Sequence, residues 1–199
     1  DGGTMVGDTG NVMCPTGRLF AKGVNLQGAP KIVKRFALRG MWQYDFSNCH
    51  FTIIRQLAAR DGQTCPALDE YLANKDEVRA NLARVANATI AEAKECLIAV
   101  GYGAGMSHRP QDAIPRLLGM ERALALYGDP VFRGLHAELA RLRRSIISPY
   151  ESRQWGLRNA LGLPFNEEYK ALEDGSLGAK KQAHVLQGIE AQALLAVLR

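Results

Sequence analysis

The chain has 199 residues and a formal net charge of +5, with 47% hydrophobic and 23% charged residues. This composition is typical of a globular protein with one sizeable core or two small lobes, and it excludes a disordered tail. No apolar run approaches the ~20 residues that span a bilayer, and the N-terminal residues lack the pattern of a signal peptide, so we expect a cytoplasmic protein without a membrane partner.

The cysteines are widely spaced and show neither a disulfide framework nor a zinc pattern. Reduced thiols are therefore expected at Cys14, Cys49, Cys65 and Cys96. The first residue is Asp1 rather than Met, which suggests a fragment or a processed chain.

The first part of the chain is predicted to be rich in loops. Residues 1–17 are glycine-rich, with a hairpin expected around Gly7–Gly10, and residues 16–30 read as a polar surface loop. Residues 31–39 form a basic segment, predicted as a short strand or one turn of helix, and residues 41–46 are predicted to be a central strand.

Helical periodicity dominates the remainder of the chain. Helices are predicted over residues 51–60, 66–73, from 75 onward, 89–102, 110–126, 130–147 and 180–198, with a loop or small hairpin within 159–178. The fold class expected from this pattern is α+β, helix-rich with a small sheet.

Asp45 lies where the predicted central strand gives way to the next helix. A carboxylate at such a junction is commonly a helix N-cap, and it is also a position where a fold can hold a metal beside a ligand pocket. The motifs in the other segments of the chain decide between these two interpretations.

Four stretches, in this order, resemble the motifs of the family A DNA polymerases, the bacterial DNA polymerase I type. Thr16-Gly17-Arg18-Leu19 with Asn25-Leu26-Gln27 and Pro30 resembles a palm segment, and Asp45-Phe46-Ser47 is similar to motif A. Ala93-Lys94, Ile98 and Tyr102-Gly103 follow motif B, and Gln187-Gly188 resembles the pair that precedes motif C.

The resemblance implies template-directed phosphoryl transfer with two Mg²⁺ ions, because this chemistry depends on charge neutralisation and in-line positioning. Asp45 would be a catalytic metal ligand, and the backbone carbonyl of Phe46 would add to the metal shell. Phe46, Ser47 and His50 would contact the nucleoside triphosphate.

Lys94, Ile98 and Tyr102 are spaced by four residues and would share one face of a helix. By resemblance, Lys94 would act in catalysis by neutralising the triphosphate, and all three would bind the nucleotide, with Tyr102 stacking beside the incoming base. The alternative is an amphipathic helix with Ile98 and Tyr102 buried and Lys94 at the rim.

The same resemblance makes primer-template DNA the expected macromolecular partner. Arg18, Asn25, Gln27 and Gln187 would contact the duplex near its minor groove. Two basic clusters would bind phosphates or simply form solvated helix faces: Lys31, Lys34, Arg35 and Arg39, and Arg141, Arg143 and Arg144.

The chain departs from the family pattern at several positions. His50 stands where the DNA polymerases carry the Glu that excludes a ribose 2′-hydroxyl; it is expected to be a steric wall or a packed residue supporting Tyr102. Ile90 replaces an expected Arg, whose place at the phosphates Arg79 or Arg84 would take, and Ala183 replaces an expected Asn. Nothing matches motif C, so a further segment or chain would have to supply the second carboxylate.

We therefore expect a polymerase palm-like antiparallel sheet with a helical fingers subdomain. Residues 1–60 would be palm with motif A, residues 61–155 fingers with motif B, and residues 156–199 a return to the palm. The predicted function is a DNA-directed DNA polymerase that adds dNTPs to a primer 3′ end, with little activity in this piece alone. The alternatives are a single-subunit RNA polymerase or primer-making relative, a non-catalytic nucleic-acid-binding module, and an unrelated helical protein.

Overall fold

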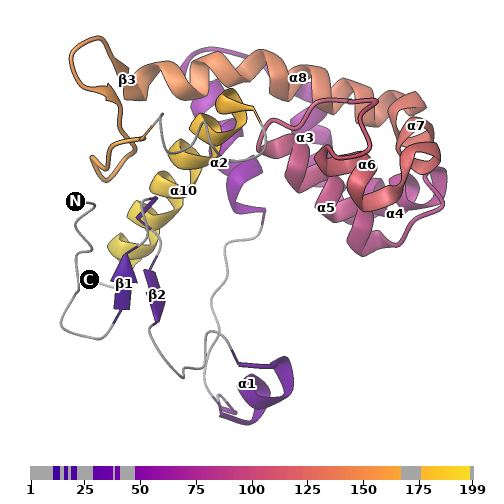
Figure 1. Ribbon diagram of the computed structural model, residues 1–199, viewed down its shortest axis with the longest axis horizontal. Helices are drawn as coiled ribbons and strands as arrows, with labels where there is room; N and C mark the ends of the chain where they lie inside the picture. The colour runs from indigo at the N-terminus through magenta and orange to yellow at the C-terminus, as the bar shows by residue number, and fades with distance from the viewer. Residues whose placement is uncertain are drawn as a thin grey trace.

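The computed structural model describes residues 11–13, 16–17, 19–21, 29–37, 39–40, 48–166 and 176–197. This part of the chain is mainly helical and carries two small antiparallel strand pairs (Figure 1). The predicted α+β class is confirmed at this level.

The first strand pair consists of β1 (Asn11–Met13) and β2 (Leu19–Ala21), with Val12 opposite Phe20. The prediction of a loop throughout residues 16–30 is wrong in this detail, because β2 lies inside that range. The hairpin expected around Gly7–Gly10 and the strand expected over residues 41–46 lie outside the described residues.

The helices carry most of the fold. They are α1 (Lys31–Ala37), α2 (Cys49–Arg60), α3 (Pro66–Ala73), α4 (Lys75–Val85), α5 (Ile90–Gly101), α6 (Ala113–Leu118), α7 (Met120–Gly128), α8 (Pro130–Ile147) and α10 (Leu177–Val197), with the 3₁₀ turn η1 (Ser148–Tyr150) after α8. The basic segment at residues 31–39 is thus helical in α1, and none of the side chains of that helix is buried.

One predicted boundary is wrong. The single helix expected over residues 110–126 is two helices, because Gly119 adopts a left-handed φ of 79° between α6 and α7 and so turns the chain. A second strand pair that was not predicted, β3 (Glu151–Ser152) with β4 (Gly156–Leu157), precedes the loop or hairpin expected within 159–178, where residues 159–166 form no helix.

Helix α8 is the central packing element and contacts α2, α3, α5, α7 and α10. It begins with Pro130 in its first turn, and the Asp129 carboxylate accepts hydrogen bonds from the backbone N–H groups of Val131 and Phe132, both at 2.9 Å. Its buried side chains recur at helical spacing: Phe132, Leu135, Leu139, Leu142, Ile146 and Ile147. This apolar face forms the middle of the core.

Helix α10 crosses α8 and α2, which brings the end of the chain beside a helix from its first third (Figure 1). Val185 and Leu186 are fully buried in this crossing. Among the described helices, none combines the length and the apolar character that a bilayer crossing requires.

Helix α5 begins as predicted at Thr89. The Thr89 hydroxyl accepts a hydrogen bond from the Glu92 backbone N–H at 3.1 Å, and the Glu92 carboxylate accepts one from the Thr89 backbone N–H at 2.7 Å. This reciprocal capping box satisfies two N–H groups that a helix start leaves unpaired. The Thr89 hydrogen bonds, backbone first, lower the pKa of Glu92.

We expect Thr89→Ala to reduce the free energy of unfolding by about 1 kcal/mol, the usual cost of losing an N-cap side chain. Urea unfolding followed by circular dichroism measures the loss.

The pKa of Glu92 is lower in the folded state than in the unfolded state. The contribution of Glu92 to the free energy of unfolding is therefore fully present above its unfolded pKa, and it is lost as the pH falls through its folded pKa. The difference between wild type and Glu92→Gln should therefore shrink in acid, and a difference that grows there would contradict this assignment.

Candidate functional site

The structure describes about half of the residues that the sequence singles out. His50, Lys94, Ile98, Tyr102 and Gln187 are described. The remaining predicted site residues lie outside the described part of the chain: Arg18, Asn25, Gln27, Asp45, Phe46 and Ser47.

Three of the predicted segments meet at His50. The Nδ1 atom of His50, at the start of α2, lies 2.9 Å from the Tyr102 hydroxyl at the end of α5. Its Nε2 atom lies 3.2 Å from a carboxylate oxygen of Glu190 in α10. The His50 and Tyr102 rings pack with their centroids 4.9 Å apart. The expectation that His50 supports Tyr102 is confirmed.

One neutral tautomer of His50 satisfies both contacts. With its proton on Nε2, the ring donates to Glu190 and accepts from the Tyr102 hydroxyl at Nδ1. The His50 and Glu190 side chains are only 17% and 26% exposed. This half-buried chain of hydrogen bonds fixes the orientation of the tyrosine ring.

The outer face of α5 carries the predicted nucleotide-binding row. Lys94 is exposed, Ile98 is 38% exposed and Tyr102 is half-buried. The helix buries a different set of side chains: Ala93, Cys96, Leu97, Val100 and Gly101. The alternative of a buried Ile98 is therefore wrong, and the row from Lys94 to Ile98 faces away from the core.

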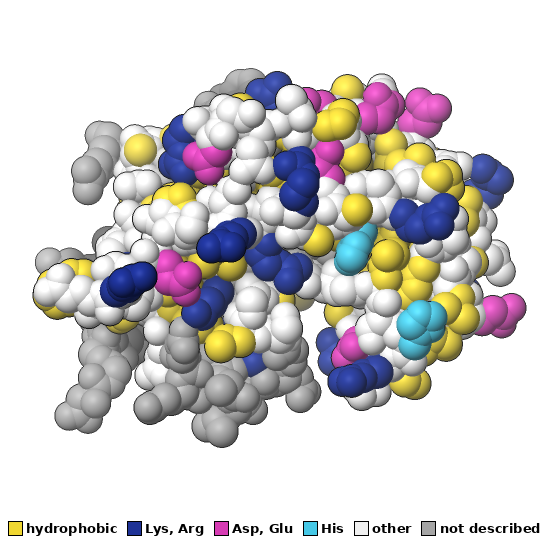
Figure 2. Space-filling view, turned by 90° about the horizontal axis from the view of Figure 1, so that it is seen from above, with side chains coloured by type: hydrophobic (Ala, Val, Ile, Leu, Met, Phe, Trp, Pro, Cys, Tyr) yellow, Lys and Arg dark blue, Asp and Glu magenta, His cyan; other side chains and the backbone are white. Residues whose placement is uncertain are grey.

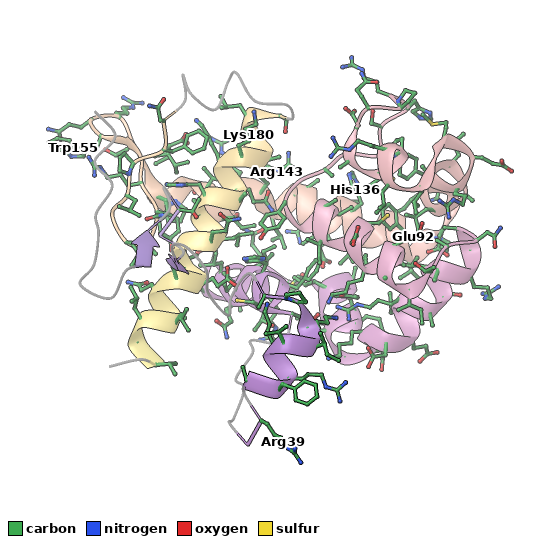
Figure 3. The ribbon with its side chains drawn as sticks, turned by 60° about the horizontal axis from the view of Figure 1, so that its bottom comes forward. Arg39, Glu92, His136, Arg143, Trp155 and Lys180 are labelled. Carbon is green, nitrogen blue, oxygen red and sulfur yellow. The ribbon has the colours of Figure 1, made fainter. Side chains whose placement is uncertain are left out.

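The C-terminal end of α5 is held by polar side chains from two other helices. Arg143 of α8 donates to the Gly103 carbonyl at 2.9 Å and to the Gln182 side-chain oxygen at 3.0 Å. Gln182, fully buried in α10, donates to the Gly101 carbonyl at 2.7 Å. These bonds satisfy carbonyls that a helix end leaves unpaired. Figure 3 labels Arg143 at this junction.

His136 of α8 belongs to the same junction. Burial, and next the neighbouring Arg143 guanidinium, lower the pKa of His136, against an opposing hydrogen bond with the Ala104 backbone. The imidazole is therefore favoured in its neutral form there.

Asn159 joins the two terminal segments that the sequence picked out. Its side-chain NH₂ donates to the Thr16 carbonyl at 3.0 Å, and its oxygen accepts from the backbone N–H groups of Leu161 and Leu163. It also packs against Gly188, where a Cβ atom would lie 2.5 Å from the Asn159 Cβ. Gly188 thus admits Asn159 to the helix surface, and the half-buried Gln187 lies next to this contact.

Arg79 is the base that approaches the end of the Asp45 segment. Its guanidinium donates to the Asn48 side-chain oxygen and to the Tyr71 hydroxyl, each at 2.6 Å. Arg84 bonds instead to Asn81 on the exposed side of α4. Of the two bases considered as a replacement for the missing motif B Arg, Arg79 is the one that bonds to Asn48, three residues after Asp45 in the sequence.

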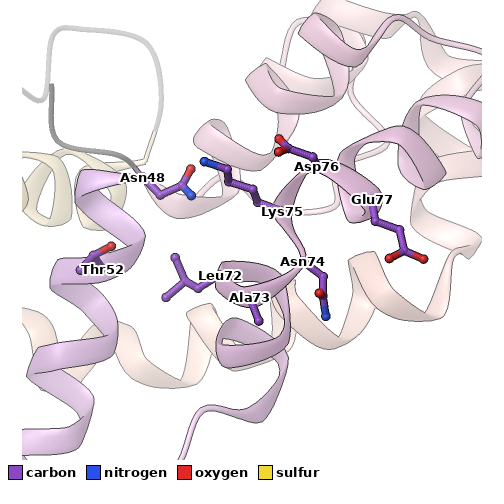
Figure 4. A pocket seen from close by; sticks show the side chains of 8 residues that line it. All are labelled: Asn48, Thr52, Leu72, Ala73, Asn74, Lys75, Asp76 and Glu77. Carbon is purple, nitrogen blue, oxygen red and sulfur yellow. The ribbon is translucent and has the colours of Figure 1, made fainter. Parts of the chain in front are cut away.

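A pocket of about 370 Å³ opens between the start of α2 and the junction of α3 with α4 (Figure 4). Asn48 and Thr52 line one side, and Lys75, Asp76 and Glu77 line the other. Two carboxylates against one ammonium make this pocket poorly suited to a triphosphate. Lys94, Ile98 and Tyr102 are not among its lining residues.

The described residues contain no cluster of three or more His, Cys, Asp or Glu side chains that could hold a metal. The buried cysteines Cys65 and Cys96 are free thiols, as predicted. Burial raises the pKa of Cys96 to about 12, so this thiol stays protonated and is not a nucleophile.

The chain matches no protein-family model, and no curated protein or solved structure is detectably similar to it. The geometry described above is therefore the basis for any functional conclusion.

Sequence reasoning missed Asn159, Gln182 and Glu190, and it placed Arg143 in a phosphate-binding or solvated cluster rather than at the end of α5. Gln182 and Glu190 lie inside a helical pattern, where a polar residue ordinarily faces solvent. The only available signal was position, since Gln182 and Glu190 flank the Gln187-Gly188 pair.

We expect Gly188→Ala to lower the free energy of unfolding by about 1–3 kcal/mol, because the new methyl group overlaps Asn159. Gly134→Ala is the matched control: Gly134 lies inside α8, and nothing lies within 4 Å of a Cβ there. That control should raise stability by up to about 1 kcal/mol through helix propensity. Chemical denaturation of both variants measures the effects, and equal shifts would refute the packing role of Gly188.

Proposed function

We propose that this chain is the palm and fingers part of a template-directed nucleotidyltransferase, a DNA polymerase that extends a primer 3′ end. The observation that carries the proposal is the contact of His50, Tyr102 and Glu190. His50 lies five residues after Asp45, Tyr102 belongs to the motif B segment, and Glu190 follows the Gln187-Gly188 pair by two residues. Their contact brings together the helices that carry or adjoin these motifs, which a shared site requires.

The exposed row on α5 supports nucleotide binding. Lys94 and Ile98 lie one turn apart on the open face, and Tyr102 continues that row to the helix end. An ammonium group placed there can neutralise triphosphate oxygens, and the ring of Tyr102, oriented by His50, can stack beside a base.

The proposed metal site rests on Asp45 and the backbone carbonyl of Phe46. Both offer hard oxygen ligands, the class that Mg²⁺ prefers. When bound there, Mg²⁺ would neutralise charge on the transferred phosphoryl group. The link from Arg79 to Asn48 would place a guanidinium near the same segment.

The proposed DNA contacts involve Arg18, Asn25, Gln27 and Gln187. Asn159 links Thr16 to Gly188, which lie two positions before Arg18 and one position after Gln187 in the chain. We propose that donors from both segments reach the same stretch of minor groove, where acceptors are shared by all base pairs.

His50 favours a second candidate within the same chemistry. A single-subunit RNA polymerase or primer-making enzyme admits ribonucleotides, and this chain lacks the motif A Glu that would exclude them. Glu190 brings a carboxylate to His50 from α10 instead.

The complete natural protein that contains this chain should extend a primer in the presence of Mg²⁺. We expect Asp45→Ala to abolish extension, because it removes a metal ligand. Lys94→Ala should lower kcat about 10²- to 10³-fold, as for other losses of one preorganised charge-stabilising donor. Gel-based primer extension with dNTPs and rNTPs side by side measures both effects and the sugar preference.

Glu95→Ala is the matched control, since Glu95 is the exposed neighbour of Lys94 on α5; it should leave extension unchanged. Absence of extension by a protein that binds primer-template would reject the polymerase and favour a non-catalytic nucleic-acid-binding module.

A further inference from the structure

A groove of about 750 Å³ lies between the C-terminal end of α8, the β3–β4 hairpin and the N-terminal part of α10. Its charged lining consists of Arg143, Arg144, Arg153 and Lys181, with Glu151 as the one carboxylate. We call it the basic groove. On the face shown in Figure 2, Lys and Arg side chains gather on the half that carries this hairpin.

The positive charge of the basic groove is only partly compensated. Glu151 pairs with Lys181 at 2.9 Å, and Arg143 is committed to Gly103 and Gln182. Arg144 and Arg153 are exposed and form no ion pair within the described part of the chain. Two guanidinium groups are thus available to an anionic ligand, and guanidinium is well matched to phosphate.

The groove is distinct from a merely solvated basic helix face. Arg141, the third basic residue at the end of α8, bonds to the Gln63 side chain and the Thr64 carbonyl. It does not line the groove, whereas Arg143 and Arg144 do. In this basic cluster, Arg141 therefore makes structural contacts, whereas Arg143 and Arg144 line the groove.

An exposed aromatic ring lies on the hairpin that forms one wall of the groove. Trp155 lies in the turn between β3 and β4 and is 62% exposed. Figure 3 shows it at the outer end of the hairpin, with Arg143 and Lys180 nearer the helices. Arg153 and Gly156, on either side of it in the chain, both line the groove.

We propose that the basic groove binds single-stranded nucleic acid, with Arg144 and Arg153 on the phosphates and Trp155 stacked on an unpaired base. A groove with phosphate-binding cations and an aromatic platform is the combination that holds single strands without sequence preference. A paired base offers no free face to Trp155, so the aromatic ring favours a single strand over a duplex. Only Arg143 and Arg144 of this site belong to a predicted basic cluster; the hairpin residues Arg153 and Trp155 belong to no predicted motif. The proposed binding needs neither nucleotide nor metal.

The test is fluorescence anisotropy of labelled oligo-dT binding to the whole chain over a series of salt concentrations. Trp155→Ala should weaken binding about 5- to 150-fold, the range that stacking of one base supplies. Arg144→Ala and Arg153→Ala should each lower the slope of log K against log salt by about 0.7, the value for one lost single-strand phosphate contact. An abasic oligonucleotide should bind wild type as weakly as it binds Trp155→Ala.

Arg116→Ala is the charge-matched control, since Arg116 is exposed on α6, away from the groove. It should leave the oligo-dT affinity and the salt slope unchanged, because Arg116 does not line the groove and so releases no counterion there. Arg116, Arg144, Arg153 and Trp155 are exposed, and thermal unfolding should confirm that their variants fold. The proposal is overturned if Trp155→Ala binds like wild type, if duplex is preferred, or if Arg116→Ala is as damaging as the groove variants.

Asp45→Ala should retain full oligo-dT binding, because Asp45 belongs to the proposed metal site and not to the groove. A failure of the polymerase proposal can therefore be distinguished from a failure of the groove proposal.

Discussion

The burial of one face of α8 is the interaction on which the rest of the structure depends. Phe132, Leu135, Leu139 and Leu142 are almost completely removed from solvent along this face. Each such side chain contributes about 1.5–3 kcal/mol when fully buried. Helices α2, α3, α7 and α10 pack on this helix, so elements far apart in the sequence are brought together by the same apolar stripe.

The polar residues of α8 use that fixed position in two ways. Arg143 donates hydrogen bonds to the Gly103 carbonyl at the end of α5 and to Gln182 of α10. These bonds hold the chain in place directly after Tyr102, the C-cap residue of α5. Both Arg143 and Arg144 line the basic groove, but Arg144 is exposed and makes none of these bonds. Because a helix advances by about 100° per residue, the two side chains point in different directions, and only Arg143 reaches the end of α5.

Local signals predicted the helices well where caps and periodicity agree. Residues 66–73 and 130–147 are helical as expected, and in both a proline in the first turn marks the start. The prediction failed at Gly119, since the apolar pattern runs through it while the backbone turns to a positive φ. It also failed at the short strands, since two or three residues contain too little of a period-two pattern to be seen.

The sequence by itself determined the helical character of the chain, the capping box at Thr89 and the row from Lys94 to Tyr102, because these depend on neighbours within one or two turns. Only the tertiary structure decided the partners of His50, Gly188 and Gly103. Glu190, Asn159 and Arg143 meet them from distant parts of the chain, and a polar side chain shows no local pattern that names a partner across the core. Burial selects those partners, since each polar group withdrawn from water must find a hydrogen bond where packing places it.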